Sequence, residues 1–475
     1  MPKTERITFY SLLALLIWLP IPLASNRPWA WSIMEIWVAL QTLALLVHYR
    51  GTLPWQQLLA FKWLLGPLVL FQLWTLLQII PVPLSTLFWI SPKTADIYHQ
   101  ATNSVTGLTI TTASLSLDRE QTFISLLKGV SYFLLALNVC LLVNNGSRVK
   151  WVVSALVISG TLQAFYGAML VLLDIKSSPV FGFALGDIAT GSFVYKNHLA
   201  NYLMMVLSLG IGLIVSQMHA SPSQNWRIRF VRWIQAMLSN KMLIRLCLVI
   251  MVIALVMTRS RMGNTAFFAA TVIGSILVLL LYKHRPRAFT VLIVSILAID
   301  TIVVGTLFGL EKVKQRLEQT SLDQEDRDQV VYWGLDIIRD FPLTGTGAGS
   351  FYSTFQAYQQ EFLGIFYDHA HNDYLQFAIE SGLPATLMLG AMVLLTLWYT
   401  LWTLRNRHSQ LMKGVAFGCC MAIIGMLIHI SVDFNLQPPA NAATFIVILC
   451  LATIVRQMPR DGWVTANKAG IIHRK

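Results

Sequence analysis

Long apolar runs set the strongest limit on how this chain of 475 residues can fold. Runs of about 17 to 25 residues recur from one end to the other, and this is the length at which a helix crosses a bilayer. We place about twelve spans, at 7–25, 29–47, 57–80, 122–143, 150–173, 199–217, 243–258, 263–282, 288–309, 384–404, 413–432 and 440–457. The sequence therefore predicts an all-α polytopic membrane protein in which residues 1–475 form a single integral membrane domain.

The composition agrees with this fold class and limits the possible partners. Hydrophobic residues make up 56% of the chain and charged residues only 12%, about half the charged share of a soluble protein. The net charge of +13 does not indicate a nucleic-acid-binding protein, because the basic residues cluster in short loops where the positive-inside rule and anionic lipid explain them. The five cysteines all fall inside apolar spans with no CxxC spacing, so neither a disulfide nor a zinc site is predicted.

The distribution of lysine and arginine predicts the orientation in the membrane. Basic segments such as "NNGSRVK", "NWRIRFVRW", "KHRPR" and "RNRHSQLMK" are assigned to the cytoplasm, whereas the short outer loops "SNRPW" and "SVDFNLQPPAN" hold a single Arg27 between them. The first span follows Lys3 and Arg6 like a signal peptide, but "ASNRPW" is a poor cleavage site and another span follows at once. We therefore expect an even number of spans, with the N- and C-termini in the cytoplasm.

This orientation leaves three sizeable outer segments, at 81–121, 174–198 and 310–383. The last is a large loop between spans 9 and 10, and we expect it to contain short helices. Val330, Trp333, Ile337 and Phe341 recur at helical spacing and give one apolar face, which Pro342 ends. The following "GTGAGS" lacks the ending of a phosphate-binding P-loop, so that interpretation has little support.

The same outer loop ends in "YDHAHNDYLQ", which holds two histidines within three residues. Asp368 or Asn372 is suited to cap a short helix that Gly382–Pro384 would end, with His369 and His371 at or before its first turn. Solvated loop histidines are one interpretation. A metal site is a weaker one, because HxH with one nearby Asp lacks the spacing of zinc enzymes.

Two further outer elements carry cations. Arg259 and Arg261 stand in a very short turn, "MTRSRMGN", where positive charge is disfavoured; a phosphate partner would explain them, and so would snorkelling to lipid headgroups. "GSFVYKNHLANYL" places Lys196 and His198 at the start of a span, where Asn197 or His198 could instead serve as a helix cap.

A fourth outer element is "HISVD", in which His429 and Asp433 lie one helical turn apart. A structural pair is the favoured interpretation there. Together the four elements gather cationic and polar side chains at one membrane face, while carboxylates inside the spans are scarce. An ion-coupled transporter usually needs such carboxylates, so the pattern favours an outward-facing site for a phosphate-bearing lipid.

The residues at these positions resemble a known family. "HNDYLQFAIESG" is similar to the HNxYLQxxxExG segment of the O-antigen ligase and Wzy-type polymerase superfamily, and "TRSRMGN" to its SRxG segment. "GSFVYKNHLANYL" resembles its GxFxNxNxLAxxL stretch, and "FPLTGTGAGSF" its PxxGxGxGxF turn. The motifs occur in family order over residues 185–460. Tyr195 departs from the pattern, because the family often has Asn there.

The resemblance implies a GT-C-like membrane fold and a metal-independent, inverting glycosyltransferase without a cofactor. Such enzymes take a glycan from undecaprenyl diphosphate at the periplasmic face of the bacterial inner membrane. The favoured acceptor is lipid A–core, as in O-antigen ligation for lipopolysaccharide; a second lipid-linked glycan, as in a polymerase, is the alternative. A protein O-oligosaccharyltransferase is less favoured, because the chain ends soon after its last span. A lipid-linked glycan transporter without chemistry remains the rival class.

The resemblance also assigns roles. His371 is predicted to be the base, since imidazole titrates near the working pH, and Arg261 to stabilise the departing diphosphate with Arg259 or Arg327 as helper. Lys196 and Asn197 would bind donor sugar or phosphate, and His369 is a rival for the base. The other predicted substrate contacts are His198, Asn372 and Tyr374.

Overall fold

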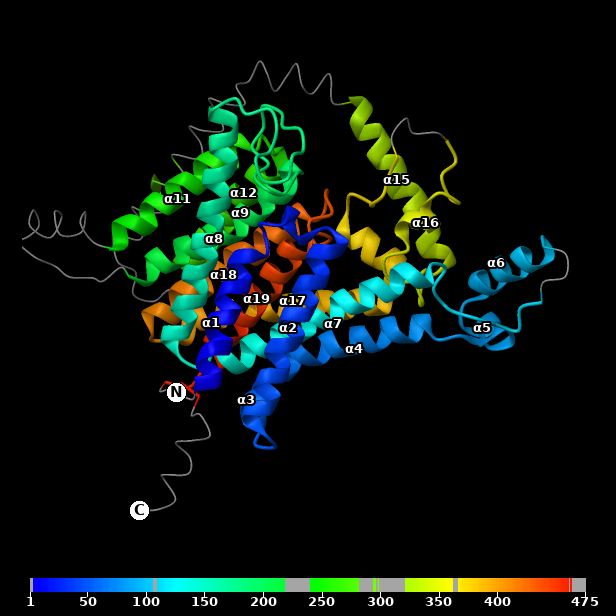
Figure 1. Cartoon of the computed structure of the whole chain (residues 1–475), viewed down its shortest axis with the longest axis horizontal. Coiled ribbons are helices and arrows are strands. Elements are labelled where there is room, and N and C mark those ends of the chain that lie inside the picture. The colour runs from blue at the N-terminus through cyan, green and yellow to red at the C-terminus, as the bar shows by residue number, and fades with distance from the viewer. Residues whose placement is uncertain are drawn as a thin grey trace, which may run out of the picture.

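Helices account for most of the chain in the computed structural model, which describes residues 3–105, 109–217, 240–281, 294–295, 298, 321–361, 366–460 and 462–463 (Figure 1). In chain order the elements are α1 (Lys3–Trp18), the 3₁₀ turn η1 (Leu23–Ser25), α2 (Pro28–Tyr49), α3 (Trp55–Ala60), α4 (Lys62–Ile79), α5 (Leu84–Ile90), α6 (Pro92–Asn103), α7 (Arg119–Leu142), α8 (Gly146–Leu172), α9 (Lys196–Ser216), α11 (Asn240–Met257), α12 (Arg261–Leu281), α15 (Ser321–Asp340), α16 (Phe351–Phe355), α17 (Asp373–Asn406), α18 (Gln410–His429) and α19 (Pro439–Gln457). Strands β1 (Val82–Pro83) and β2 (Thr112–Ala113) pair antiparallel, with Val82 opposite Ala113.

The predicted polytopic membrane fold is confirmed. Within the described ranges, nine helices are long and apolar enough to cross a membrane: α2, α4, α7, α8, α9, α12, α17, α18 and α19. α1 and α11 also coincide with predicted spans. The predicted span 57–80 is wrong in one respect, because Phe61 leaves the helical conformation to bury its ring and divides the segment into α3 and α4. The predicted span 288–309 lies almost wholly outside the described residues.

The centre of the bundle is the crossing of α9 and α18. Small residues on both helices let the two backbones approach closely: a side chain at Gly212 would meet the Gly414 carbonyl oxygen, and one at Gly418 would meet the Ser208 carbonyl oxygen. Without a hydrophobic driving force between helices in lipid, such close contact is the main source of their association. α9 is consequently almost entirely buried, and its first turn is held beside the end of α18.

The start of α1 and the segment after α19 meet at one face of the bundle, and this face lies opposite the site described below. Arg148 Nη1 donates to Glu5 Oε1 at 2.7 Å, and Asn144 Nδ2 donates to the same oxygen at 3.2 Å. The Trp463 backbone N–H donates to the Asn144 carbonyl at 2.8 Å. Figure 1 shows α1 toward the lower left, with α15 and α16 on the far side. The start of α1 and the described residue Trp463 therefore lie close together on one side of the bundle.

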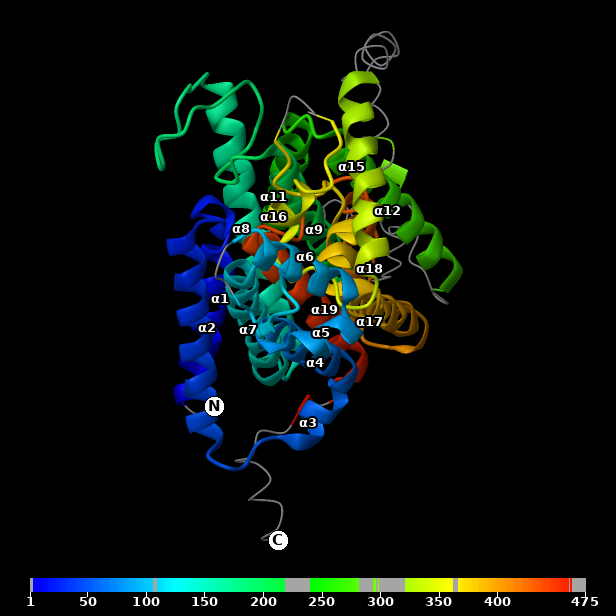
Figure 2. The ribbon, with the colours of Figure 1, turned by 90° about the vertical axis from the view of Figure 1, so that its right-hand side faces the viewer.

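A small helical module covers the other face. The predicted apolar face of α15 is confirmed: Val330, Trp333, Ile337 and Phe341 are buried in one cluster with Phe351 and Phe355 of α16. α15 ends at Asp340, two residues before Pro342. Figure 2 shows this module standing over α17 and α18, with α5 and α6 beside it.

The glycine-rich turn after α15 holds this module against the bundle. Its N–H groups are used internally: Gly347 donates to the Glu380 carbonyl at 2.9 Å, Gly349 to Glu380 Oε2 at 2.9 Å, and Ala348 to Gln78 Oε1 at 3.2 Å. Gly347 has φ +110°, and a Cβ there would lie 2.3 Å from Ser116 Oγ. The turn is thus a clamp rather than a phosphate cradle, in agreement with the absence of the P-loop ending.

Candidate active site

The "HND" motif begins α17, and hydrogen bonds within this helix and to the loop 430–438 fix its position. Asn372 is the cap, since its side chain accepts from the Leu375 N–H at 3.1 Å, which decides between it and Asp368. The buried Asp373 carboxylate accepts from the Leu436 N–H at 2.8 Å and from Gln437 Nε2 at 3.0 Å. These bonds hold the loop 430–438, which follows α18, directly against the motif. The predicted end of the short helix at Gly382–Pro384 is a kink, where Gly382 has φ +78° and α17 continues beyond it.

His371 faces a carboxylate from this loop. Its Nδ1 lies 3.6 Å from Asp433 Oδ1, an ion-pair distance slightly longer than a hydrogen bond. Asn197 Nδ2 donates to the other oxygen, Asp433 Oδ2, at 2.5 Å and lies 2.9 Å from the Tyr195 hydroxyl. His371 also has φ +49°, an uncommon conformation for a residue other than glycine. Three motifs far apart in sequence therefore meet at one carboxylate.

A single aromatic ring organises the surrounding side chains. Phe434 stacks on His369 (ring centroids 4.5 Å apart) and on Tyr195 (5.6 Å). His371 and His198 meet the same ring edge-on, at 4.7 Å and 4.8 Å. Aromatic pairs of this kind prefer such stacked or edge-to-face geometries. Phe434 therefore sets the positions of both predicted base candidates and of the start of α9.

His369 is held by a second chain of polar contacts. Its Nδ1 lies 3.1 Å from Gln376 Nε2, which also donates to Glu380 Oε1 at 3.0 Å. Glu380 in turn accepts from the Gly349 N–H of the glycine-rich turn. His369 is thus fixed on one side by ring stacking and on the other by an amide. Neither histidine is the solvated loop residue of the alternative interpretation, because both are half-buried.

Burial decides the direction of the pKa shift of His369, whereas neighbouring charge decides that of Asp433. Burial lowers the pKa of His369 below its ordinary value; the interaction with the neighbouring His371 ring acts in the same direction, and that with Asp368 acts against it. Burial alone would raise the pKa of Asp433, but the interaction with His371 and the nearby His198 and His429 outweigh it, so the pKa lies below its usual range. Asp433 is therefore an anion at neutral pH.

The region beneath these side chains contains buried polar atoms that make no hydrogen bond within the described chain. They are His198 Nε2, Asn201 Oδ1, His371 Nδ1, both ring nitrogens of His429, both amide atoms of Asn435, and Asn441 Oδ1. Buried polar groups without partners cost free energy, so their concentration at one place is typical of a site built for a ligand. Across the described residues, no group of three His, Cys, Asp or Glu side chains is arranged to hold a metal ion.

Two predictions about these residues are wrong. His429 and Asp433 do not form a pair on one helix face, because α18 ends at His429 and the chain turns, so Asp433 reaches Asn197 and His371 instead. Neither Asn197 nor His198 caps α9, which begins at Lys196 after Tyr195 without a side-chain cap. The Asn197 amide is occupied by Asp433 and Tyr195.

The basic turn lies next to the start of α9. Ser260 begins α12 by accepting from the Gly263 N–H at 3.1 Å, and a side chain at Gly263 would collide with Ala200 of α9. Arg259 and Arg261 are both exposed in this turn, and Arg259 has φ +49°. The remaining predicted contacts are placed as follows: Lys196 is half-buried at the start of α9, Tyr374 donates its hydroxyl to the Leu427 carbonyl at 2.8 Å, and the side chain of Arg327 lies outside the described part of α15.

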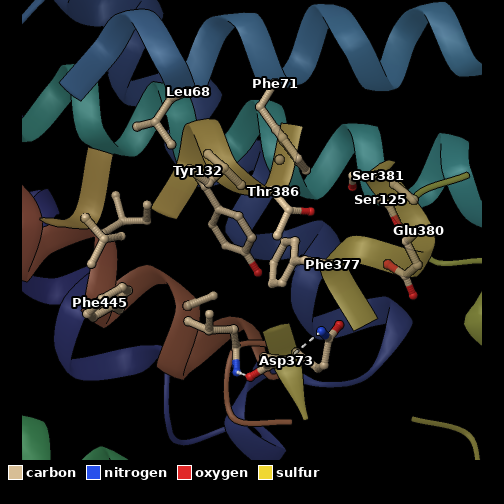
Figure 3. A pocket seen from close by; sticks show the side chains of 18 of the residues that line it. Leu68, Phe71, Ser125, Tyr132, Asp373, Phe377, Glu380, Ser381, Thr386 and Phe445 are labelled. Atoms are coloured by element: carbon tan, nitrogen blue, oxygen red, sulfur yellow. Dashed lines mark hydrogen bonds between the residues drawn. The ribbon is translucent and has the colours of Figure 1, made fainter. Parts of the chain in front are cut away.

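A cavity of about 270 Å³ opens on the other side of the motif, between α4, α7, α17 and α19 (Figure 3). Its walls are mainly apolar, with Leu68, Phe71, Tyr132, Phe377 and Phe445 among them. Asp373, Glu380 and Lys128 also line it. The cavity therefore reaches from the interior of the spans to the base of the "HND" motif.

Several of these residues escape sequence reasoning. Phe434 and Lys128 carry no recognisable signal, since one is an aromatic residue after a span and the other a single cation within one. Gln376 and Glu380 have a signal, because they are the polar letters of the HNxYLQxxxExG motif at i and i+4, which places them on one helix face.

The comparison with known families agrees with this geometry. Residues 246–390 match the family model described as O-antigen ligase (Wzy_C), a region that includes the basic turn, the glycine-rich clamp and the "HND" motif. No curated protein matches the chain. The resemblance found in the motifs to the O-antigen ligase and polymerase superfamily is confirmed by this family match, which covers residues 246–390.

Proposed function

We propose that the chain is a glycosyltransferase of the inner membrane that moves a glycan from undecaprenyl diphosphate to an acceptor hydroxyl. The favoured reaction is O-antigen ligation to lipid A–core at the periplasmic face, with both termini in the cytoplasm and a GT-C-like fold. The observation that carries this proposal is the contact of His371 with Asp433, made at the face opposite Glu5 and Trp463 and beside the arginine turn. The large outer loop and the ligase-like region 185–460 belong to the same proposal.

His371 would act as the base. Asp433 lies next to Nδ1, so it favours the tautomer with the proton on Nδ1 and leaves the Nε2 lone pair for the acceptor hydroxyl. Asn197 orients Asp433 from its other oxygen. The acceptor oxygen would attack the anomeric carbon as Nε2 takes its proton, and the bond from that carbon to the diphosphate oxygen would break with inversion.

The departing diphosphate needs positive charge, which Arg261 and Arg259 would supply. Guanidinium groups bind phosphate in a bidentate manner and stabilise charge that develops in the transition state. Their turn packs against the first turns of α9, which carries Lys196, Asn197 and His198. The mechanism proposed for these residues assigns no step to a metal ion.

His369 would position the site rather than act as the base. Its Nδ1 is engaged by Gln376 and its ring is stacked on Phe434, whereas His371 has the carboxylate partner. This arrangement supports the assignment of the base to the histidine directly before Asn372.

The test is glycan transfer in proteoliposomes with undecaprenyl-diphosphate-linked glycan, with and without lipid A–core. We expect product only with lipid A–core, and a loss of about 10²- to 10⁴-fold in His371→Ala. Arg261→Ala should also lose activity. His99→Ala, which removes an exposed histidine of α6, should transfer like wild type.

The outcomes separate the alternatives. Longer lipid-linked chains without lipid A–core would identify a polymerase that uses the same site. Full activity of both His371→Ala and Arg261→Ala would overturn the site assignment. Movement of the lipid-linked donor across the membrane without glycan transfer would replace the proposed enzyme with a transporter.

A further inference from the structure

The cavity between α4, α7, α17 and α19 has an opening toward the membrane. Gly390 of α17 lines it and is nevertheless exposed, and a Cβ at this position would meet no atom within 4 Å. Leu387 and Leu394, on the same side of the helix, are 69% and 59% exposed. Exposed leucines on a membrane-spanning helix face lipid, so the cavity is accessible to a hydrocarbon chain from the bilayer.

The end of the cavity near the glycine-rich turn is polar. Lys128, Ser125, Gly349 and Glu380 meet there. The two carboxylates of the lining already accept hydrogen bonds, Glu380 from Gly349 and Gln376, and Asp373 from Leu436 and Gln437. Both carboxylates therefore already bind groups of the protein itself.

Lys128 is different. In the described chain its ammonium group lies over the Trp31 ring at 3.7 Å from the centroid and interacts electrostatically with the Glu35 and Glu380 carboxylates, without a close ion pair or a hydrogen bond to either. A cation inside a membrane span is costly and is usually functional. Its position one turn below Ser125, and hence just beneath the glycine-rich turn, suits the phosphate of a lipid whose chain occupies the cavity.

The cavity and the arginine turn are built from different helices. The turn belongs to α11 and α12 and packs on α9, whereas no residue of these three helices lines the cavity. His369 lies between the two regions. Glu380 lines the cavity and is linked through Gln376 to this histidine, whose ring stacks on Phe434 against His198 at the start of α9. With the donor diphosphate at the arginines, the cavity is left for the second lipid.

We propose that this cavity binds an acyl chain of the phosphate-bearing acceptor lipid, with Lys128 pairing with its phosphate. This inference rests on the proposed function, since it assigns the donor to the arginine turn. It gives the enzyme two separate lipid sites on either side of the paired rings of His369 and Phe434.

The experiment is photolabelling of the full chain in nanodiscs with two probes. One is phosphatidic acid with a diazirine in an acyl chain, and the other is undecaprenyl phosphate with a diazirine near its far end. We expect the acyl probe to label peptides of α17 and α19 around the cavity. Labelling of these peptides by the polyprenyl probe alone, or by neither probe, would overturn the proposal.

Two pairs of variants sharpen the test. Gly390→Phe places a bulky ring at the open position of the cavity lining. Gly66→Phe is its control, because a Cβ at Gly66 of α4 also meets nothing within 4 Å and Gly66 does not line the cavity. We expect Gly390→Phe to lose labelling about tenfold, as expected when two or more methylene groups lose their burial. Lys128→Met should lose labelling at low probe concentration, whereas Lys128→Arg should retain it. Equal labelling of Gly390→Phe and Gly66→Phe would contradict the cavity as the site.

Transfer assays distinguish this inference from the proposed function. In Gly390→Phe the KM for lipid A–core should rise about tenfold while the KM for the donor stays unchanged. If wild type transfers no glycan but the acyl probe still labels the cavity, the proposed function fails and the lipid-chain site stands. An increase in the donor KM alone would assign the cavity to the polyprenyl chain and overturn the inference.

Discussion

Two buried polar clusters lie at opposite faces of this bundle, and they differ in how many of their polar atoms make hydrogen bonds within the protein. At the face that holds the start of α1, Arg148 and Asn144 both donate to Glu5, and the Arg148 guanidinium also contacts the Phe9 ring. At the other face, Asp433 gathers Asn197 and His371 above a layer of buried imidazole and amide atoms without partners. Among the described residues of the first cluster, Glu5 Oε2 and Trp463 Nε1 are without a hydrogen-bond partner.

The difference separates structural from functional polarity. Glu5 and Arg148 join α1 to the start of α8. Both side chains are below 10% exposed, so they are hardly accessible to a substrate. His371 is 19% exposed and combines a carboxylate partner with access from outside. A buried polar group that is satisfied by its neighbours fixes the fold, whereas one that remains unsatisfied is available to a substrate.

The largest effect is predicted for a substitution in the second cluster, at Asp433. Asp433→Asn keeps the shape but removes the charge that orients His371, and we expect transfer to fall by about 10²- to 10⁴-fold, as for loss of the base itself. The thermal inactivation midpoint in detergent should fall only modestly, because the loss of the stabilising charge of Asp433 is small beside the loss of transfer. The measurement is kcat/KM in proteoliposomes beside His371→Ala and the double variant. Because the two residues would act as a unit, the double variant should be hardly worse than either single one; multiplied losses would contradict the pairing.

The next largest effect is predicted for a substitution in the first cluster, at Arg148. Arg148→Ala leaves the Glu5 carboxylate buried without its cation, and loss of one partner of a buried pair typically costs about 3–5 kcal/mol. We expect a large loss of stability, measured by thermal inactivation, with normal transfer per folded molecule. Glu5→Gln with Arg148→Met removes both charges at similar volume and should be milder. A variant that folds normally but loses transfer would show that the inner cluster also serves the reaction.

The sequence was sufficient for the parts of the molecule that repeat a simple pattern. Apolar length predicts the described spans, and the helical spacing of Val330, Trp333, Ile337 and Phe341 predicts the buried face of α15. The cap at Asn372 and the stop before Pro342 follow from local chemistry. These features depend on neighbours within a few residues, which a single sequence displays.

The site depends on contacts between distant segments, and here the sequence was less informative. The spacing of His429 and Asp433 indicates a helical pair, but it cannot show that α18 ends between them and sends Asp433 to Asn197. Phe434 is unremarkable in sequence, although four rings of the site contact it. Its role appears only when the loop 430–438 is closed over α17.

The third prediction concerns this ring. Phe434→Ala removes the surface that orients His369 and His371, and aromatic pairs contribute about 0.5–1.5 kcal/mol each beyond burial. We expect transfer to fall about 10- to 100-fold, less than in Asp433→Asn, because the base and its carboxylate remain. Phe434→Tyr should retain most of the activity. The measurement is kcat/KM for both variants, and an unchanged value in Phe434→Ala would show that the hydrogen bonds alone position the histidines.

The smallest predicted effect is a change in how the stability of the protein depends on pH. Burial lowers the pKa of His369 below 6.5, so below this pH the unfolded chain binds a proton that the folded chain does not. Stability is therefore highest above pH 6.5 and falls as the pH decreases. Asp433, with a lowered pKa, adds stability that is lost only at more acidic pH, below about 3.8. We expect His369→Gln to weaken the decrease in the inactivation midpoint between pH 7 and pH 5, whereas His99→Gln on the exposed α6 should leave it as in wild type. An identical slope in His369→Gln and wild type would show that the acid sensitivity arises elsewhere in the bundle.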